Sequence, residues 1–141
     1  MSDSLSQIYQ LRFSGQEEYR NAIWQILVKD FFSKWIKKDS VILDLGCGYG
    51  EFINNVLDCE RHAMDLNPDT RDSLEKSVTF HEQDCSQEWP LKPNSLDLIF
   101  TSNFFEHLPN KESLNKTVAH AKSALKPGGL LIALGPNISV L

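Results

Sequence analysis

The spacing of hydrophobic residues changes once along the chain, from a helical period to short continuous runs. Between Gln16 and Lys38, apolar residues recur every three or four positions, which predicts a helix with one apolar face. After Ser40 the apolar residues come in compact runs, as in strands buried on both faces of a parallel sheet. The five predicted strands are 41–45, 62–66, 78–81, 96–101 and 130–134.

Helical segments are expected between these strands. Residues 112–125 form the clearest one, and Lys126-Pro127-Gly128-Gly129 should end it, because proline cannot continue the helix and glycine tolerates a left-handed backbone. Pro68 can occupy the first position of another short helix. Strands that alternate with helices indicate an α/β protein with a parallel sheet and helices on both faces.

Three glycines follow the first predicted strand, at Gly46, Gly48 and Gly50. Glycine lets the backbone turn sharply and approach a ligand, and the start of a helix offers free N–H groups. The pattern fits either a plain strand-to-helix turn or a ligand-binding loop. Glu51 stands where a dinucleotide-binding loop has its third glycine, and this carboxylate suits an ammonium better than a pyrophosphate.

Two acidic residues follow the next two strands. Asp65 lies 65 − 44 = 21 positions after Asp44, a distance at which an acid can accept hydrogen bonds from ribose hydroxyls. Asp84 follows the third strand and could accept from an exocyclic amine at the same sheet edge. Both could instead be surface acids that cap a turn.

The loop after the fourth strand supplies further candidates. His107 can titrate near neutral pH and serve as a base, and Glu106 stands beside it. A structural or surface histidine is the alternative.

Composition narrows the function classes. The 141 residues fit one domain, and the net charge of −5 does not favour a nucleic-acid partner. The three cysteines match no zinc pattern, so we expect no metal and reduced thiols in a cytoplasmic protein. No apolar run reaches the roughly 18 residues of a membrane span.

Taken together, these segments resemble the class I S-adenosylmethionine-dependent methyltransferases. The resemblance covers residues 41–137. Its segments are Val41–Gly50, Ala63-Met64-Asp65, Asp84, Phe105-Glu106-His107-Leu108, Leu125–Leu130 and Gly135-Pro136-Asn137.

The resemblance implies S-adenosylmethionine as the cofactor, S-adenosylhomocysteine as its product and His107 as a candidate base. Asp44 and the glycine backbone would hold the methionine end, Asp65 the ribose and Asp84 the adenine. The residues implied in cofactor binding are Asp44, Gly46, Cys47, Gly48, Asp65, Leu66, Asp84, Cys85 and Asn103.

The resemblance also implies a Rossmann-like sheet in the order 3-2-1-4-5, with the last two of the family's usual seven strands missing. Residues 1–38 would form a lid, with Tyr9, Arg12 and Phe13 as candidates over the cofactor, and residues 39–141 the binding core. The apolar strand 130–134 would then lie at a sheet edge and favour self-association.

The function implied is methyl transfer to an acceptor. Asn103 is followed by Phe104-Phe105 and not by the Pro-Pro-Tyr of methyltransferases that act on bases or amides, which favours a small-molecule acceptor. Two alternatives stay open at this stage. One is a non-catalytic module that binds the cofactor or a partner, and the other is a nicotinamide-dependent oxidoreductase.

Overall fold

A five-stranded parallel sheet forms the centre of the computed structural model, which describes residues 15–137 and 139. The strand order is β3-β2-β1-β4-β5, as predicted. The strands are β1 (Val41–Leu45), β2 (Glu60–Asp65), β3 (Thr79–Glu82), β4 (Leu96–Ser102) and β5 (Leu125–Leu134).

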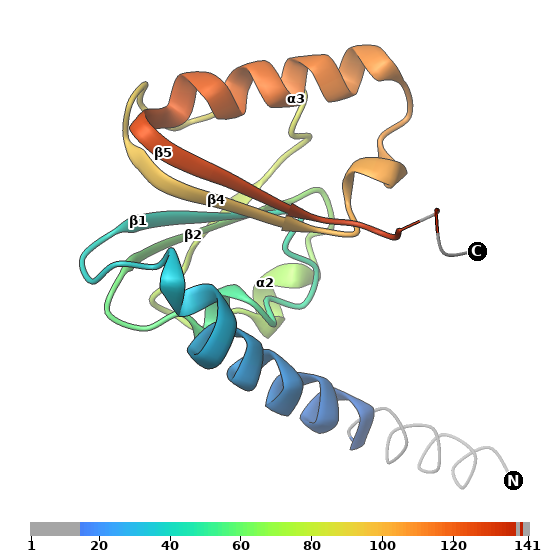
Figure 1. Cartoon of the computed structure of the whole chain (residues 1–141). Helices are drawn as coiled ribbons and strands as arrows, with labels where there is room; N and C mark the ends of the chain where they lie inside the picture. Colours follow the sequence, from blue (N-terminus) through green and yellow to red (C-terminus); the bar gives the residue numbers. More distant parts are fainter. Residues whose placement is uncertain (1–14, 138, 140–141) are drawn as a thin grey trace, which may run out of the picture.

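Helices cover both faces of this sheet, which confirms the predicted layers (Figure 1). Helix α3 (Lys111–Ala124) lies on one face, and the N-terminal helix lies with α2 (Thr70–Ser73) on the other. Asn110 caps α3, because its side chain accepts a hydrogen bond from the backbone N–H of Ser113 at 2.8 Å.

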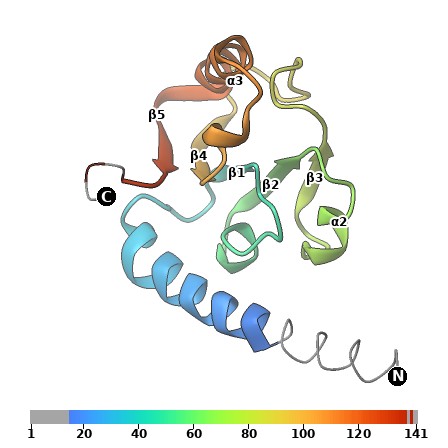
Figure 2. The same ribbon diagram turned by 90° about the vertical axis from the view of Figure 1, so that its right-hand side faces the viewer.

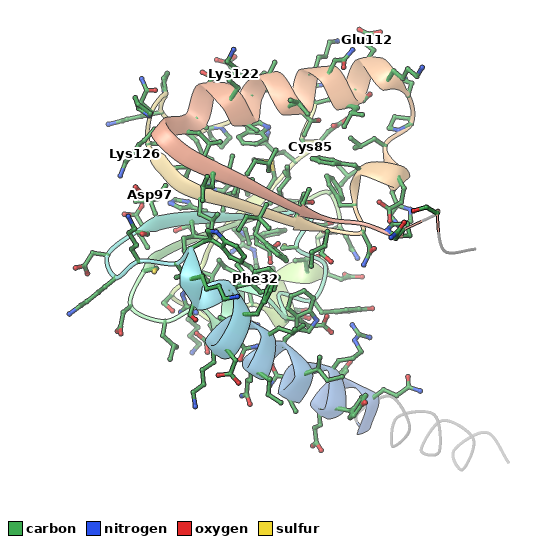
Figure 3. The ribbon with its side chains drawn as sticks, viewed as in Figure 1. Phe32, Cys85, Asp97, Glu112, Lys122 and Lys126 are labelled. Atoms are coloured by element: carbon green, nitrogen blue, oxygen red, sulfur yellow. The ribbon has the colours of Figure 1, made fainter. Side chains whose placement is uncertain are left out.

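Alternation along each strand divides the core into two apolar layers. Ile42 and Phe100 pack toward the N-terminal helix with Phe32, whereas Leu43 and Ile99 pack toward α3. Figure 3 shows Phe32 and Cys85 on opposite sides of the sheet. All four strand residues are at most 1% exposed, as expected for a parallel sheet covered on both faces.

The N-terminal helix is shorter and less regular than predicted. Residues 15–26 are α-helical, followed by a π-helical turn η1 (Leu27–Phe31) and a 3₁₀ turn η2 (Phe32–Lys34). The helix therefore ends before Lys38, because residues 37–40 turn into β1 and Asp39 adopts a left-handed backbone with φ of 63°.

The strand β5 is longer than predicted. It starts directly after α3, and its pairing with β4 shifts from Leu96↔Leu125 to Leu98↔Leu130, so residues 126–129 bulge opposite Asp97. The predicted stop of the helix is correct, since α3 ends at Ala124. The same four residues also carry the strand around the bulge, where Gly128 has φ of +80°.

The connections that follow β1 and β4 are short. After the glycine loop comes only a 3₁₀ turn, η3 (Ile53–Asn55), and a similar turn, η4 (Phe105–His107), follows β4. In Figure 2 these loops lie at the ends of β1, β2 and β4, between the N-terminal helix and α3. Within the described part of the chain, no helix is long and apolar enough to cross a membrane.

Candidate functional site

The loops that follow β1 and β4 enclose a cavity of about 270 Å³ together with the N-terminal helix. Parallel α/β sheets bind ligands at this edge, outside the carboxyl ends of the strands. The lining residues are Arg20, Trp24, Asp44, Gly46, Cys47, Gly48, Tyr49, Glu51, Phe52, Phe100, Ser102 and Asn103.

A larger cavity of about 670 Å³ lies elsewhere, between the N-terminal helix and residues 54–58. It touches neither the glycine loop nor the end of β1. We take the smaller cavity as the candidate site, because it combines bare main chain with a buried carboxylate.

The three glycines of the loop have positive φ angles but different surroundings. A Cβ at Gly46 would overlap the ring of Phe104, and a Cβ at Gly50 would collide with Leu74. A Cβ at Gly48 would meet nothing within 4 Å. Gly46 and Gly50 therefore allow close packing inside the protein, and Gly48 is the glycine whose bare backbone faces open space.

Asp65 ends β2 and contacts this loop directly. Its Oδ2 accepts a hydrogen bond from the backbone N–H of Gly48 at 3.0 Å, and its Oδ1 accepts from that of Asn67 at 2.9 Å. The carboxylate is half-buried, and each oxygen keeps a further lone pair for a ligand. Leu66, the next residue, is 68% exposed.

Asp44 occupies the inner wall of the cavity at the end of β1. It is only 3% exposed, and burial raises its pKa to about 8, with further upward contributions from the negative charges of Asp65 and Glu51. A hydrogen bond from the backbone of Ile53 acts in the opposite direction. Burial and the charge of Asp44 also raise the pKa of the Cys47 thiol, which is therefore no ready nucleophile.

Asp84 lies beyond the end of β3, close to Asp65, because the backbone N–H of Gln83 donates to the Asp65 carbonyl at 3.1 Å. The Asp84 side chain accepts from the backbone N–H and the hydroxyl of Ser86, both at 2.8 Å, which lowers its pKa. It is exposed and does not line the cavity. Cys85 is buried, with its Sγ 3.2 Å from the hydroxyl of Thr117.

Asn103 lines the opposite wall with a left-handed backbone. Its φ of 48° is unusual for a residue with a side chain, and its N–H donates to the carbonyl of Leu134 at 2.9 Å. His107 lies farther along, in η4, where it is exposed and does not line the cavity. The predicted candidates therefore fall into three groups. The cavity is lined by Asp44, Gly46, Cys47, Gly48 and Asn103, and Asp65 adjoins it through Gly48. The candidates that do not line it are Leu66, Asp84, Cys85 and His107.

Several lining residues were not predicted. Arg20 of the N-terminal helix forms an ion pair with Glu51, and its guanidinium lies 5.5 Å from the centre of the Tyr49 ring. Trp24, one helical turn later, packs edge-on against Phe100. Their spacing of four residues places Arg20 and Trp24 on one side of a helix. The neighbouring sequence does not indicate which loop that side contacts.

Two further expectations concern the lid and metal ions. The proposed lid residues Tyr9, Arg12 and Phe13 lie outside the described residues. Within residues 15–137 and 139, no group of three or more His, Cys, Asp or Glu side chains could hold a metal ion.

Known proteins share this fold and sequence pattern. The chain is 30% identical over 114 residues to an uncharacterised protein of Methanocaldococcus jannaschii, covering 79% of this chain and 46% of that protein. It is 31% identical over 101 residues to malonyl-[acyl-carrier protein] O-methyltransferase 2 of Ilyobacter polytropus, and this match covers 64% of this chain and 37% of that protein. This chain thus spans about half or less of the length of these curated relatives.

A solved structure from Archaeoglobus fulgidus, described as an S-adenosylmethionine-dependent methyltransferase, has the same fold. Its TM-score is 0.70 at 24% identity, and the match covers 90% of this chain and 59% of that one. Residues 16–140 match the family model described as a methyltransferase domain. The chain therefore belongs to this methyltransferase family, whose solved relatives with the same Rossmann-like fold depend on S-adenosylmethionine.

Proposed function

We propose that this chain binds S-adenosylmethionine between the glycine loop and Asp65 and supports methyl transfer to a small-molecule acceptor. The observation that carries the proposal is the pairing of Gly48 with Asp65. The backbone of Gly48 faces open space, and its N–H donates a hydrogen bond to the carboxylate of Asp65. That carboxylate can also accept hydrogen bonds from ribose hydroxyls.

The residues present fit the charge of this cofactor. Asp44 and Glu51 give the cavity wall an acidic character that suits an ammonium or sulfonium group. The carboxylates of Glu51 and Asp65 would repel a pyrophosphate, which argues against the nicotinamide-dependent alternative.

In this proposal the cofactor supplies a methyl group activated by positive sulfur, and the chain supplies position and electrostatics. Asp65 orients the ribose hydroxyls, and the Gly48 backbone allows close approach. The backbone N–H of Gln83 donates a hydrogen bond to the Asp65 carbonyl, which brings the next residue, Asp84, close to Asp65. Asp84 would contact the adenine. Leu66 and the backbone of Cys85 would complete that end of the site.

The acceptor would approach from the side of Asn103. The hydrogen bond from its N–H to the carbonyl of Leu134 holds Asn103 at the cavity wall. A small acceptor is favoured by the net charge of −5 and by Phe104-Phe105 after Asn103. His107 enters as a base only if the acceptor must lose a proton and η4 moves toward the cavity.

Calorimetric titration with S-adenosylmethionine, S-adenosylhomocysteine and NAD tests the proposal. We expect one site for the first two ligands, at least tenfold weaker binding in Asp65→Ala, and no binding of NAD. Glu112→Gln is the matched control, since Glu112 lies on α3, away from the cavity, and pairs with Lys116. A folded chain that binds neither adenosyl ligand would refute the proposal, and binding without methyl transfer to any offered acceptor would favour a non-catalytic module.

A further inference from the structure

The glycine loop is anchored to β2 where it begins. The backbone N–H groups of Gly46 and Cys47 both donate to the carbonyl of Met64, at 2.8 and 3.2 Å. Gly48, in the middle of the loop, donates to the carboxylate of Asp65, and the proposed cofactor site depends on that contact. The position of Gly48 therefore also depends on what holds the far end of the loop.

Asn54 holds that far end. Its backbone N–H donates to the carbonyl of Gly50 at 2.9 Å, and its side-chain amide bridges residues 73–75, where α2 ends. The amide nitrogen donates to the carbonyl of Ser73 at 2.8 Å, and the amide oxygen accepts from the backbone N–H of Glu75 at 3.0 Å. These partners fix the orientation of the amide, because a reversed amide would bring two donors together at Glu75 and two acceptors together at Ser73.

Packing supports the same link. A Cβ on Gly50 would lie 2.5 Å from the Leu74 side chain and 3.1 Å from the amide nitrogen of Asn54. Neither Asn54 nor Leu74 lines the cavity. Residues 73–75 are therefore linked to the end of the glycine loop from outside the site, by two hydrogen bonds and one close apolar contact.

This link and the bond between Gly48 and Asp65 act on the same pair of loops. Asp65 ends β2, and only residues 66–69 and α2 separate it from the segment that Asn54 holds. The loop after β1 and the chain after β2 are thus joined on both sides of Gly48. Movement of the far end of the loop away from α2 would draw Gly48 away from the Asp65 carboxylate.

We propose that Asn54 is a positioning residue for the cofactor, which keeps the Gly48 backbone and the Asp65 carboxylate at the separation that the ribose end of S-adenosylmethionine requires. This inference rests on the proposed function. Asn54 contacts no ligand in this arrangement, and it acts only through the loop that it holds.

The next residue in the chain offers a matched control. Asn55 is half-buried like Asn54, and its amide nitrogen also makes two hydrogen bonds, to Asn21 at 2.9 Å and to the carbonyl of Glu51 at 2.7 Å. Neither of these bonds reaches residues 73–75. Asn54→Ala and Asn55→Ala therefore remove the same side chain from the same turn, but only Asn54→Ala releases α2 from the loop.

Amide NMR and calorimetry on the two variants test the proposal. In the ligand-free chain, Asn54→Ala should move the amide proton of Gly48 upfield, because its bond to Asp65 lengthens, and Asn55→Ala should leave it in place. S-adenosylhomocysteine should bind about fivefold more weakly to Asn54→Ala, as for the loss of one hydrogen bond. Its affinity for Asn55→Ala should match that of the unaltered chain.

A double-mutant cycle separates positioning from general loosening of the fold. If Asn54 acts through Asp65, its removal should cost little once Asp65 is already alanine, so the penalty should fall from about fivefold to less than about twofold. General loosening would give the same penalty in both backgrounds. If Asn54→Ala does not fold, Asn54→Asp takes its place, since its carboxylate still accepts from Glu75 but has no N–H for Ser73.

The outcomes separate the two proposals. The inference is overturned, and the proposed function left standing, by a Gly48 amide that stays in place in Asn54→Ala, by equal penalties in the two backgrounds, or by a penalty in Asn55→Ala as large as that in Asn54→Ala. Failure of the folded, unaltered chain to bind either adenosyl ligand would overturn the proposed function itself.

Discussion

The ring of Phe104 lies directly against Gly46, in the space that a Cβ would fill. This contact joins the loop after β4 to the loop after β1, so the two walls of the cavity are held together. Asn103, one residue before Phe104, is fixed at its other side by the hydrogen bond to Leu134. The geometry of the site thus depends on packing behind it as well as on residues inside it.

Alanine at Gly46 should destabilise the fold, whereas alanine at Gly48 should mainly weaken ligand binding. Gly46→Ala combines steric overlap with a φ of 68°, so we expect a loss of about 2–4 kcal/mol in the free energy of unfolding. Gly48→Ala has room for the methyl group and should cost about 1 kcal/mol from its φ of 52°. Urea denaturation measures both, and equal losses would contradict the distinction.

Asparagine at position 65 should not preserve ligand binding. Both carboxylate oxygens accept from backbone N–H groups, so the amide nitrogen of Asp65→Asn would face a donor at Gly48 or at Asn67. We expect affinity for S-adenosylhomocysteine to fall about as far as in Asp65→Ala, at least tenfold. Calorimetry measures this, and near-normal affinity of the asparagine variant would show that the carboxylate charge and its two contacts are unimportant.

Stability should fall as the pH rises from 5 to 8. The pKa of Asp44 is raised to about 8 in the folded chain from the ordinary aspartate value of 3.8, so the native state binds a proton that the unfolded state has released. This contribution is complete below the unfolded value, declines between the two values with a slope of at most about 1.4 kcal/mol per pH unit, and is lost once the pH has risen through 8. Denaturation curves of Asp44→Asn should lack this decline, and an unchanged slope would assign it to another group.

The far end of the sheet contains a structural carboxylate. Asp97 accepts from the backbone N–H of Val41 at 2.8 Å and from the amine of Lys126 at 3.0 and 3.1 Å (Figure 3). Asp97→Ala should cost about 1–2 kcal/mol, since it leaves the first N–H of β1 without its partner. Lys126→Ala, which removes only a partly exposed ion pair, should cost less than about 1 kcal/mol in the same denaturation assay. The reverse order would contradict this account.

The edge strand β5 should promote self-association of this chain. Leu130, Leu131 and Leu134 are 43%, 36% and 38% exposed, and no charged residue occurs from 130 to 141. Light scattering at high protein concentration should show oligomers or aggregates, and Leu131→Lys should reduce them. A monodisperse monomer at the highest concentration would refute the prediction.

The sequence predicted the sheet well because each strand is a buried run with its own signal. Strand order and the two helical layers followed from family resemblance and from the alternation of elements. The bulge before Leu130 was not predicted, since it depends on the shift of register between β4 and β5 on either side of Asp97.

The site was predicted only in part. Asp44 and the glycine loop are consecutive and carry a local signal. The separate roles of Gly46, Gly48 and Gly50 depend on Phe104 and Leu74, which come from other segments of the chain. For the same reason, the contact of Arg20 with Glu51 has no local signature.

The most direct test of the central claim is an amide NMR titration of the chain with S-adenosylhomocysteine. We predict that the largest shift changes occur at Cys47, Gly48 and Tyr49 and around Asp65. Changes centred instead on Val28, Ile36 and Leu57, which line the larger cavity, would contradict the assignment of the cofactor to the glycine loop.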